Sequence, residues 1–392
     1  MPSDALSAWK KRLDEELRSL DEHNQRRSLA EIRGVSFCSN DYLGLAEHRA
    51  LRVRVAEAVL RDHKASGTGS RLLSGQTEAW SELEESFAKF AGTESALFFT
   101  SGYSANVGLL TALVGKDDVI FSDALNHASL IDGMRLSGAR KVIYPHLNLN
   151  ALEGALRQEA DAPWRKLIVT ESVFSMDGDI APLAEIAELA EKYNAALILD
   201  EAHATAVHGP SGRGLAVAQE LAHRVLAIVH TCGKALASAG AFVCGSSVLK
   251  EHLVNHARTF IFSTALPPYI AAQIGAALEL SEGMDGERAG LLERAGGLRT
   301  SLRAEGFATG NTASQIVPVV LGSNEVTLDA AEHLQREGFA VRGIRPPTVP
   351  TGSSRLRLSL TARIPEAELS RLVSTLVAWR ARQTLHVAAR HA

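Results

Sequence analysis

Four polar side chains follow two short apolar runs of the sequence and could do chemistry together. Asp200 and His203 come after the run ALIL, and Thr231 and Lys234 come after the run VLAIV. Each run is typical of a fully buried strand. Neighbouring parallel strands bring their carboxyl ends to one edge of a sheet, where ligands bind. We therefore predict that these four side chains converge on one crevice.

Lys234 is the candidate nucleophile of this crevice. Its neighbours from residue 231 to 237 are small or apolar, unlike the surroundings of a solvated surface cation. Burial lowers the pKa of a lysine and makes its neutral amine available for covalent catalysis. The alternative is a structural lysine whose amine reaches solvent from an apolar loop. The presence of Asp200 and His203 in the same predicted crevice disfavours this alternative.

Asp200 is a candidate catalytic carboxylate. It could instead cap a helix after a strand, but the 34 residues that separate it from Lys234 suit one crossover between neighbouring strands. The letters DEAH at 200–203 also name a helicase motif, which requires a phosphate loop of the form GxxxxGK[ST]. The two Gly-Lys pairs, at 115–116 and 233–234, are followed by Asp and Ala, so the helicase interpretation fails.

Two further segments could bind charged groups. The segment 100–106 lies between a strand and a helix, where backbone N–H groups hold phosphates, although its Ser-Gly pair could simply cap the helix. The glycine- and serine-rich segment 67–75 could approach a phosphate or be a flexible loop. Arg355 and Arg357 share one face of a strand, so one could bind a carboxylate bidentately while the other is a surface charge.

Bulk properties exclude several classes. The chain has 392 residues, 46% hydrophobic and 22% charged, and a formal charge of −4, which gives no general attraction to nucleic acid or acidic membranes. The charged N-terminus offers no signal peptide, and the apolar run 265–280 is too short to span a membrane. His203 and His208 have no third ligand nearby, and the three cysteines show no zinc spacing, so we expect no metal and a reducing cytoplasm.

The elements that position these residues alternate between strands and helices, which predicts a mostly parallel sheet covered by helices. An amphipathic helix over 7–20 carries an apolar stripe that must dock on the body or on a second subunit. After about residue 282 the sequence pattern becomes that of half-buried strands, including 355–360, which alternate with helices. We predict three parts, which are an arm and short strand at 1–48, a large α/β domain at 49–282 and a small α+β domain at 283–392.

Several motifs together resemble one enzyme family. They are DEAH (200–203), TCGKALASAG (231–240), SNDYLGL (39–45), GTGSRLLSG (67–75), TSGYSANVGLL (100–110), NHASLIDG (126–133), ESVFSMDGD (171–179) and RPPTVPTGSSRLRLSL (345–360). The sequence resembles the pyridoxal-phosphate (PLP) enzymes of fold type I, and within them the α-oxoamine synthases. Those enzymes condense an amino acid with an acyl thioester and release carbon dioxide.

The resemblance implies a role for each candidate residue. Lys234 would form the Schiff base with PLP, and Asp200 would keep the pyridine nitrogen protonated. The other residues that the resemblance assigns to PLP are His203 at the phenolic oxygen, His127 stacked on the ring, Ser175 at the cofactor oxygen, and Gly102, Tyr103 and Thr231 at the phosphate. Arg357 and Asn40 would hold the amino-acid carboxylate, and Ser353 would contact substrate.

The segments 257–268 and 345–360 most resemble the biotin-pathway member of the family. This implies L-alanine and a pimeloyl thioester, carried by CoA or a carrier protein, as substrates of a cytoplasmic homodimer with sites at the interface. Other amino acids or acyl groups within the family, an aminotransferase or aldolase on the same scaffold, and a non-catalytic partner subunit remain alternatives. The family's acyl-contacting N-terminal arginine has no clean match, although Arg26 and Arg27 lie near that position.

Overall fold

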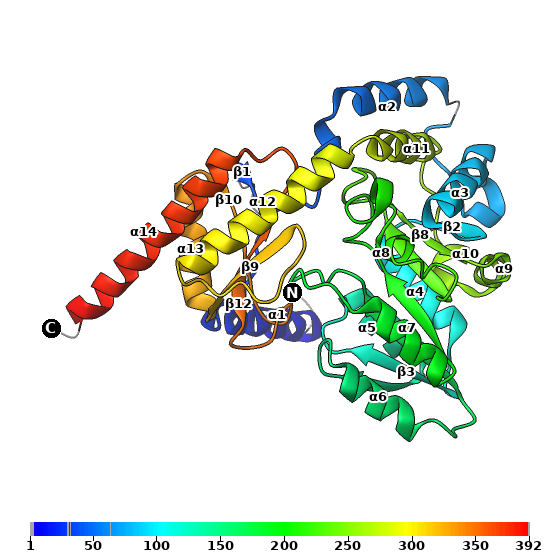
Figure 1. Ribbon diagram of the computed structural model, residues 1–392, viewed down its shortest axis with the longest axis horizontal. Helices are drawn as coiled ribbons and strands as arrows, with labels where there is room; N and C mark the ends of the chain where they lie inside the picture. The colour runs from blue at the N-terminus through cyan, green and yellow to red at the C-terminus, as the bar shows by residue number, and fades with distance from the viewer. Residues whose placement is uncertain (1–3, 30, 32, 63, 391–392) are drawn as a thin grey trace.

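A computed structural model describes residues 4–29, 31, 33–62 and 64–390, with side chains to residue 383. A larger part is built around a central sheet, and a smaller C-terminal part lies beside it (Figure 1). The long helix α12 (Asp285–Ala304) belongs to the smaller part and runs up toward helices α2 (Arg49–Arg61) and α11 (Tyr269–Glu282) of the larger one.

The central sheet has seven strands in the order β2-β8-β7-β6-β5-β3-β4. All are parallel except β8, which runs antiparallel to both of its neighbours. Their bounds are β2 Ser95–Phe99, β3 Asp118–Asp123, β4 Arg140–Tyr144, β5 Arg165–Glu171, β6 Ala195–Asp200, β7 Ala227–Thr231 and β8 Ala241–Gly245. The neighbouring parallel strands β6 and β7 end at Asp200 and Thr231, which confirms the predicted pairing of the two apolar runs.

Both faces of this sheet are covered, as a parallel sheet requires. Leu197 and Leu199 of β6 enter one hydrophobic cluster and Ile198 enters another, because successive side chains of a strand point to opposite faces. The helices of the larger part, besides α2 and α11, are α3 (Glu78–Ala91), α4 (Gly102–Leu113), α5 (Ala128–Ser137), α6 (Leu149–Gln158), α7 (Leu183–Lys192), α8 (Leu215–Ala218), α9 (Ser247–His256) and α10 (Arg258–Ile261).

The C-terminal part contains a three-stranded antiparallel sheet in the order β11-β12-β9, flanked by helices. Its further elements are β9 (Ile316–Gly322), α13 (Asn324–Arg336), β10 (Phe339–Ala340), β11 (Gly343–Ile344), β12 (Ser354–Ser359) and α14 (Glu366–Arg390). Strand β1 (Val35–Ser36) pairs with β10, so a segment near the N-terminus is fixed to the C-terminal part. Every residue of β12 is buried, which corrects the expectation of a half-buried strand.

Helix α1 (Asp4–Glu22) contains the predicted apolar stripe, but none of its residues is buried and Trp9 is 59% exposed. The stripe therefore does not dock on the body of this chain. The segment Arg71–Gly75 of the predicted glycine- and serine-rich loop forms one π-helical turn. Within the described residues, no helix is long and apolar enough to cross a membrane.

Candidate active site

The amine of Lys234 lies at one end of a chain of polar contacts. Its Nζ is 2.8 Å from Nε2 of His203, and Nδ1 of that ring is 2.6 Å from the hydroxyl of Tyr42. The Tyr42 hydroxyl donates to Oδ1 of Asn40 over 3.1 Å. The chain joins the carboxyl edge of the sheet to the segment that follows β1.

The protonation of this chain follows from burial. Burial lowers the pKa of Lys234 to about 8, although Asp200 and Glu171 oppose the shift. Burial and the neighbouring Lys234 hold the pKa of His203 well below its ordinary value, so its ring is neutral. A Lys234 ammonium then donates to Nε2, which leaves the proton of the ring on Nδ1 facing Tyr42.

Asp200 begins a second chain of contacts. It is 5% exposed, its Oδ1 accepts from the Ala202 N–H over 2.8 Å, and its Oδ2 accepts from Nδ2 of Asn106 over 2.6 Å. The same amide donates to Ser129, whose hydroxyl is 2.7 Å from Nδ1 of His127. Asp200 and His127 are thus fixed by two residues, Asn106 and Ser129, that the sequence analysis did not select.

The start of helix α4 faces the end of β7. A Cβ at Gly102 would lie 2.7 Å from Oγ1 of Thr231, so any larger residue would displace the Thr231 side chain. Ser101 caps the helix through a capping box with Ser104, which keeps the first backbone N–H groups in place. An anion such as a phosphate suits this position. Tyr103 is half exposed and donates from its hydroxyl to Asp132.

Arg357 reaches the same region from β12. Its Nε donates to the Ser175 carbonyl over 2.6 Å and its Nη1 donates to Oδ1 of Asn40 over 3.1 Å. Its buried Nη2 has no hydrogen-bond partner among the described residues. The guanidinium is therefore oriented by protein acceptors and keeps N–H groups for a ligand carboxylate.

The prediction that Arg355 is a surface charge was wrong. Arg355 is buried and forms an ion pair with Asp177. Both arginines contact the loop after β5, because their shared face of the strand packs against that loop.

This loop, which we name the 173–180 hairpin, is closed by a bridge between Val173 and Ile180. The Phe174 N–H donates to the Asp179 carbonyl over 2.9 Å. Gly178 at its tip has a φ of +70°, and a Cβ there would lie 2.2 Å from the carbonyl oxygen of Ile316 in β9. The hairpin therefore packs tightly against the C-terminal part.

Two buried carboxyl groups were also missed from the sequence. Glu171, at the end of β5, accepts from the Ser175 N–H over 3.2 Å, and burial together with Asp200 raises its pKa to about 8. Glu201 accepts from the N–H groups of Leu215 and Ala216 at the start of α8, and burial raises its pKa to about 7. Glu171 faces the site, whereas Glu201 holds a helix.

The remaining predicted residues lie outside these chains of contacts. The Ser353 hydroxyl donates to the Pro350 carbonyl over 2.7 Å, within its own turn. His208 is buried 3.0 Å from Oε1 of Gln315. In the described part of the chain, no group of His, Cys, Asp and Glu side chains could hold a metal ion.

Pyridoxal phosphate fits the residues that the structure brings together. The site combines an amine of lowered pKa, a buried carboxylate, a neutral imidazole and a helix start at which Thr231 leaves no room for a Cβ. Lys234, Asp200, His203 and the residues around Gly102 are the groups that would hold it.

Comparison with known proteins agrees with this geometry. The family described as aminotransferase class I and II matches residues 32–376, so the chain belongs to this family. Among curated relatives, 8-amino-7-oxononanoate synthase of Geobacter sulfurreducens is 46% identical over 92% of this chain and 96% of its own length. The enzyme of the same name from Burkholderia vietnamiensis is 48% identical over 88% of this chain and 86% of its own length.

Solved structures show the same similarity. Serine palmitoyltransferase from S. paucimobilis, determined with bound PLP and myriocin, has a TM-score of 0.86 at 29% identity, covering 96% of this chain and 99% of that one. The 8-amino-7-oxononanoate synthase of Francisella tularensis has a TM-score of 0.78 at 28% identity, covering 90% and 99%. The fold is accordingly that of the fold type I PLP-transferases.

The close approach of Gly102 to Thr231 gives a first prediction. Gly102→Ala places a methyl group against Thr231, and we expect PLP affinity to fall about tenfold, since forcing a group into a filled site costs ~1–3 kcal/mol. Equilibrium titration of cofactor-free protein with PLP measures the effect. Gly115→Ala is the matched control, because a Cβ there meets nothing within 4 Å. Equal affinities for wild type and Gly102→Ala would contradict the placement.

Proposed function

We propose that the protein condenses L-alanine with a pimeloyl thioester to give 8-amino-7-oxononanoate, carbon dioxide and free thiol. The observation that carries the proposal is the buried Arg357, whose Nη2 has no hydrogen-bond partner in the part of the chain that the structure describes. Its guanidinium is joined to Lys234 through Asn40, Tyr42 and His203. The names of the relatives supply the particular substrates.

The amino-acid side of the reaction uses the groups around Lys234. Bound PLP supplies an electron sink for the α-carbon of the substrate. Lys234 removes the proton from that carbon, and the low pKa of its amine suits a base near neutral pH. Asp200 would keep the ring nitrogen of the cofactor protonated, and His127 would lie against the ring. His203 would lie at the phenolic oxygen, with its ring proton on Nε2 once the Lys234 amine has moved away from that nitrogen.

Arg357 determines which bond is broken. A bidentate contact with the carboxylate would fix the rotation about the bonds of the α-carbon, and with it the choice of the bond that the bound cofactor activates. The Ser175 carbonyl and Asn40 hold the guanidinium in one orientation. The substrate carboxylate leaves as carbon dioxide after the new carbon–carbon bond has formed and the thiol has departed.

The acyl donor has a separate cavity of about 240 Å³ beside this site. Apolar side chains line much of it, among them Leu125, Phe174, Met176 and Val349. Arg27 donates to the hydroxyl of Thr348 at the wall of this cavity over 3.3 Å. We assign the apolar walls to the methylene chain of the pimeloyl group and Arg27 to its terminal carboxylate.

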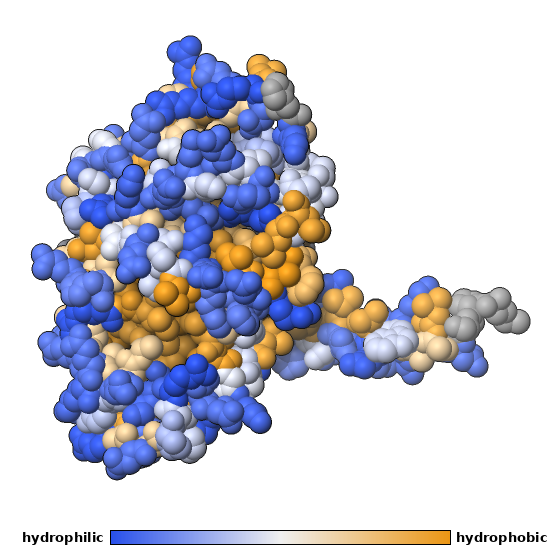
Figure 2. Space-filling view, turned by 90° about the vertical axis from the view of Figure 1, so that its right-hand side faces the viewer, coloured by the Kyte–Doolittle hydropathy of each residue, from blue (hydrophilic) through white to orange (hydrophobic). Residues whose placement is uncertain are grey.

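A second copy of the chain completes the proposed enzyme. Figure 2 shows apolar side chains gathered over a broad part of one face of the molecule, which is typical of an interaction surface. Leu72 and Leu73 of the turn at 71–75 are 50% and 85% exposed. We propose a homodimer, which sedimentation equilibrium tests.

The free cysteines Cys38, Cys232 and Cys244 suit a reducing cytoplasm.

Substrate choice tests the reaction directly. We expect thiol release from pimeloyl-CoA with L-alanine, and much less with glycine or L-serine, when each is measured by a thiol-reactive dye. The structural similarity to serine palmitoyltransferase makes L-serine with palmitoyl-CoA the second candidate. Faster thiol release with that pair would replace the proposal.

Arg357 provides a residue-level prediction. Arg357→Lys loses the planar bidentate fork, and we expect the KM for L-alanine to rise about 10- to 100-fold at nearly unchanged KM for the acyl donor. The control is Arg54→Lys in α2, whose guanidinium pairs with Glu279 at the surface. Steady-state kinetics with each substrate varied in turn measures both constants. A larger change in the KM of the acyl donor would contradict the assignment.

Arg27 tests the acyl side in the same way. Arg27→Ala removes the proposed partner of the terminal carboxylate, so we expect the KM for pimeloyl-CoA to rise several-fold, about tenfold at most for an exposed pair. The KM for heptanoyl-CoA, which has the same chain length without the carboxylate, stays as in wild type. Equal effects on the two thioesters would argue against the contact.

A further inference from the structure

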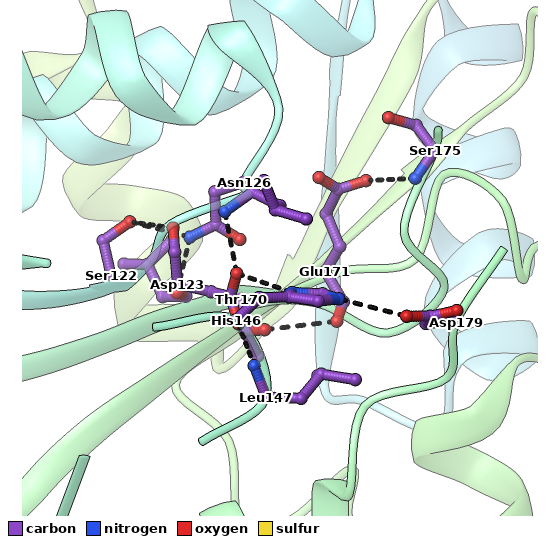
Figure 3. A network of polar contacts seen from close by, with 11 residues as sticks. Ser122, Asp123, Asn126, His146, Leu147, Thr170, Glu171, Ser175 and Asp179 are labelled. Atoms are coloured by element: carbon purple, nitrogen blue, oxygen red, sulfur yellow. Dashed lines mark hydrogen bonds and ion pairs between the residues drawn. The ribbon is translucent and has the colours of Figure 1, made fainter. Parts of the chain in front are cut away.

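An Asp–His–Asp cluster lies outside the residues assigned above (Figure 3). Nδ1 of His146 is 2.9 Å from Oδ1 of Asp123, and its Nε2 is 3.2 Å from Oδ2 of Asp179. His146 follows β4, Asp123 ends β3, and Asp179 belongs to the 173–180 hairpin. The histidine therefore joins the edge of the central sheet to the hairpin.

The cluster is rigid and largely enclosed. Asp123 is 2% exposed and also accepts from the N–H groups of Leu125 and Leu147, over 2.8 and 2.9 Å. The His146 ring meets the ring of Phe174 edge-on, with centroids 4.4 Å apart. The imidazole is thus held at both nitrogens and on one side.

The geometry requires a cationic imidazole. Each ring nitrogen faces a carboxylate oxygen, which can only accept, so both contacts are hydrogen bonds only when both nitrogens carry protons. Burial alone would lower the pKa of His146, but its hydrogen bonds to Asp123 and Asp179 outweigh that effect and raise the pKa to about 9. A further titratable group at the cluster is Tyr144 of β4, and burial together with Asp123 raises its pKa, so it stays neutral.

The hairpin passes this restraint to the substrate site. The Asp179 carbonyl closes the hairpin by accepting from the Phe174 N–H. The next residue, Ser175, accepts from Nε of Arg357 over 2.6 Å and donates its own N–H to Glu171 over 3.2 Å. A shift of Asp179 would therefore move the carbonyl that orients Arg357.

We propose that His146 is a positioning residue, which as a cation between Asp123 and Asp179 fixes the 173–180 hairpin and so holds Arg357 in its carboxylate-binding orientation. The inference rests on the role proposed above for Arg357. It adds to that role a residue that acts on the substrate only through the 173–180 hairpin and Arg357.

The test compares His146→Gln, Asp179→Asn and the double variant with wild type, all loaded with PLP. We expect each single variant to raise the KM for L-alanine roughly tenfold with little change in kcat, because a small misplacement of a binding group has effects of this order or larger. The double variant should show about the same KM as either single variant, since both changes remove the same ion pair between His146 and Asp179. His256→Gln is the control, because His256 is exposed in α9 and its Nδ1 is 2.9 Å from the His252 carbonyl of the same helix.

A second measurement, the pH dependence of the melting temperature, distinguishes loss of the His146 cation from a general destabilisation of the variant. The pKa of His146 is about 9 in the folded protein and near 6.5 when unfolded, so its stabilisation is complete below pH 6.5 and is lost as the pH rises through 9. The melting temperature of His146→Gln should thus lie below that of wild type at pH 6.5 and approach it at pH 10.

Three results would overturn the inference. They are an unchanged KM for L-alanine in His146→Gln, additive effects in the double variant, and a melting difference that stays constant up to pH 10. Failure of the wild-type protein to bind L-alanine would instead refute the proposed function. The kinetics of the wild type alone reveal this outcome.

Discussion

The removal of the Lys234 amine from water is the constraint on which the rest of the site depends. Lys234 lies in the loop between β7 and β8, and its amine is 2.8 Å from an imidazole that burial keeps neutral. Its pKa falls to about 8, so a modest fraction is an uncharged nucleophile near neutral pH. Asp200 and Glu171 oppose this shift, which keeps the amine titratable rather than permanently neutral.

The site is assembled from three distant stretches of the chain. The edge of the central sheet supplies Lys234 and Asp200, the segment after β1 supplies Asn40 and Tyr42, and β12 supplies Arg357. The pairing of β1 with β10 fixes the second stretch to the third, and the Ala362 N–H donates to the Tyr42 carbonyl over 2.7 Å. The proposed substrate-binding groups and the proposed nucleophile are therefore positioned by contacts between the two parts of the protein.

The sequence predicts the elements and residues that leave a local pattern. Buried parallel strands form continuous apolar runs, and the polar residues that follow them are placed at the sheet edge by topology alone. Asn106, Ser129 and His146 leave no such pattern, because each is defined by a partner that is remote in sequence. The bond from Asn106 to Asp200, for example, joins residues 94 positions apart. Arg355 was assigned to the surface because the burial of its face depends on the 173–180 hairpin, which local spacing does not reveal.

The central claim is that one desolvated amine carries the cofactor. Reduction of the PLP-loaded protein with borohydride, followed by digestion and mass spectrometry, locates the residue to which the cofactor becomes attached. The account predicts a single phosphopyridoxyl group on Lys234, which is lost in Lys234→Ala. A label on another lysine, or no label after loading with PLP, would contradict it.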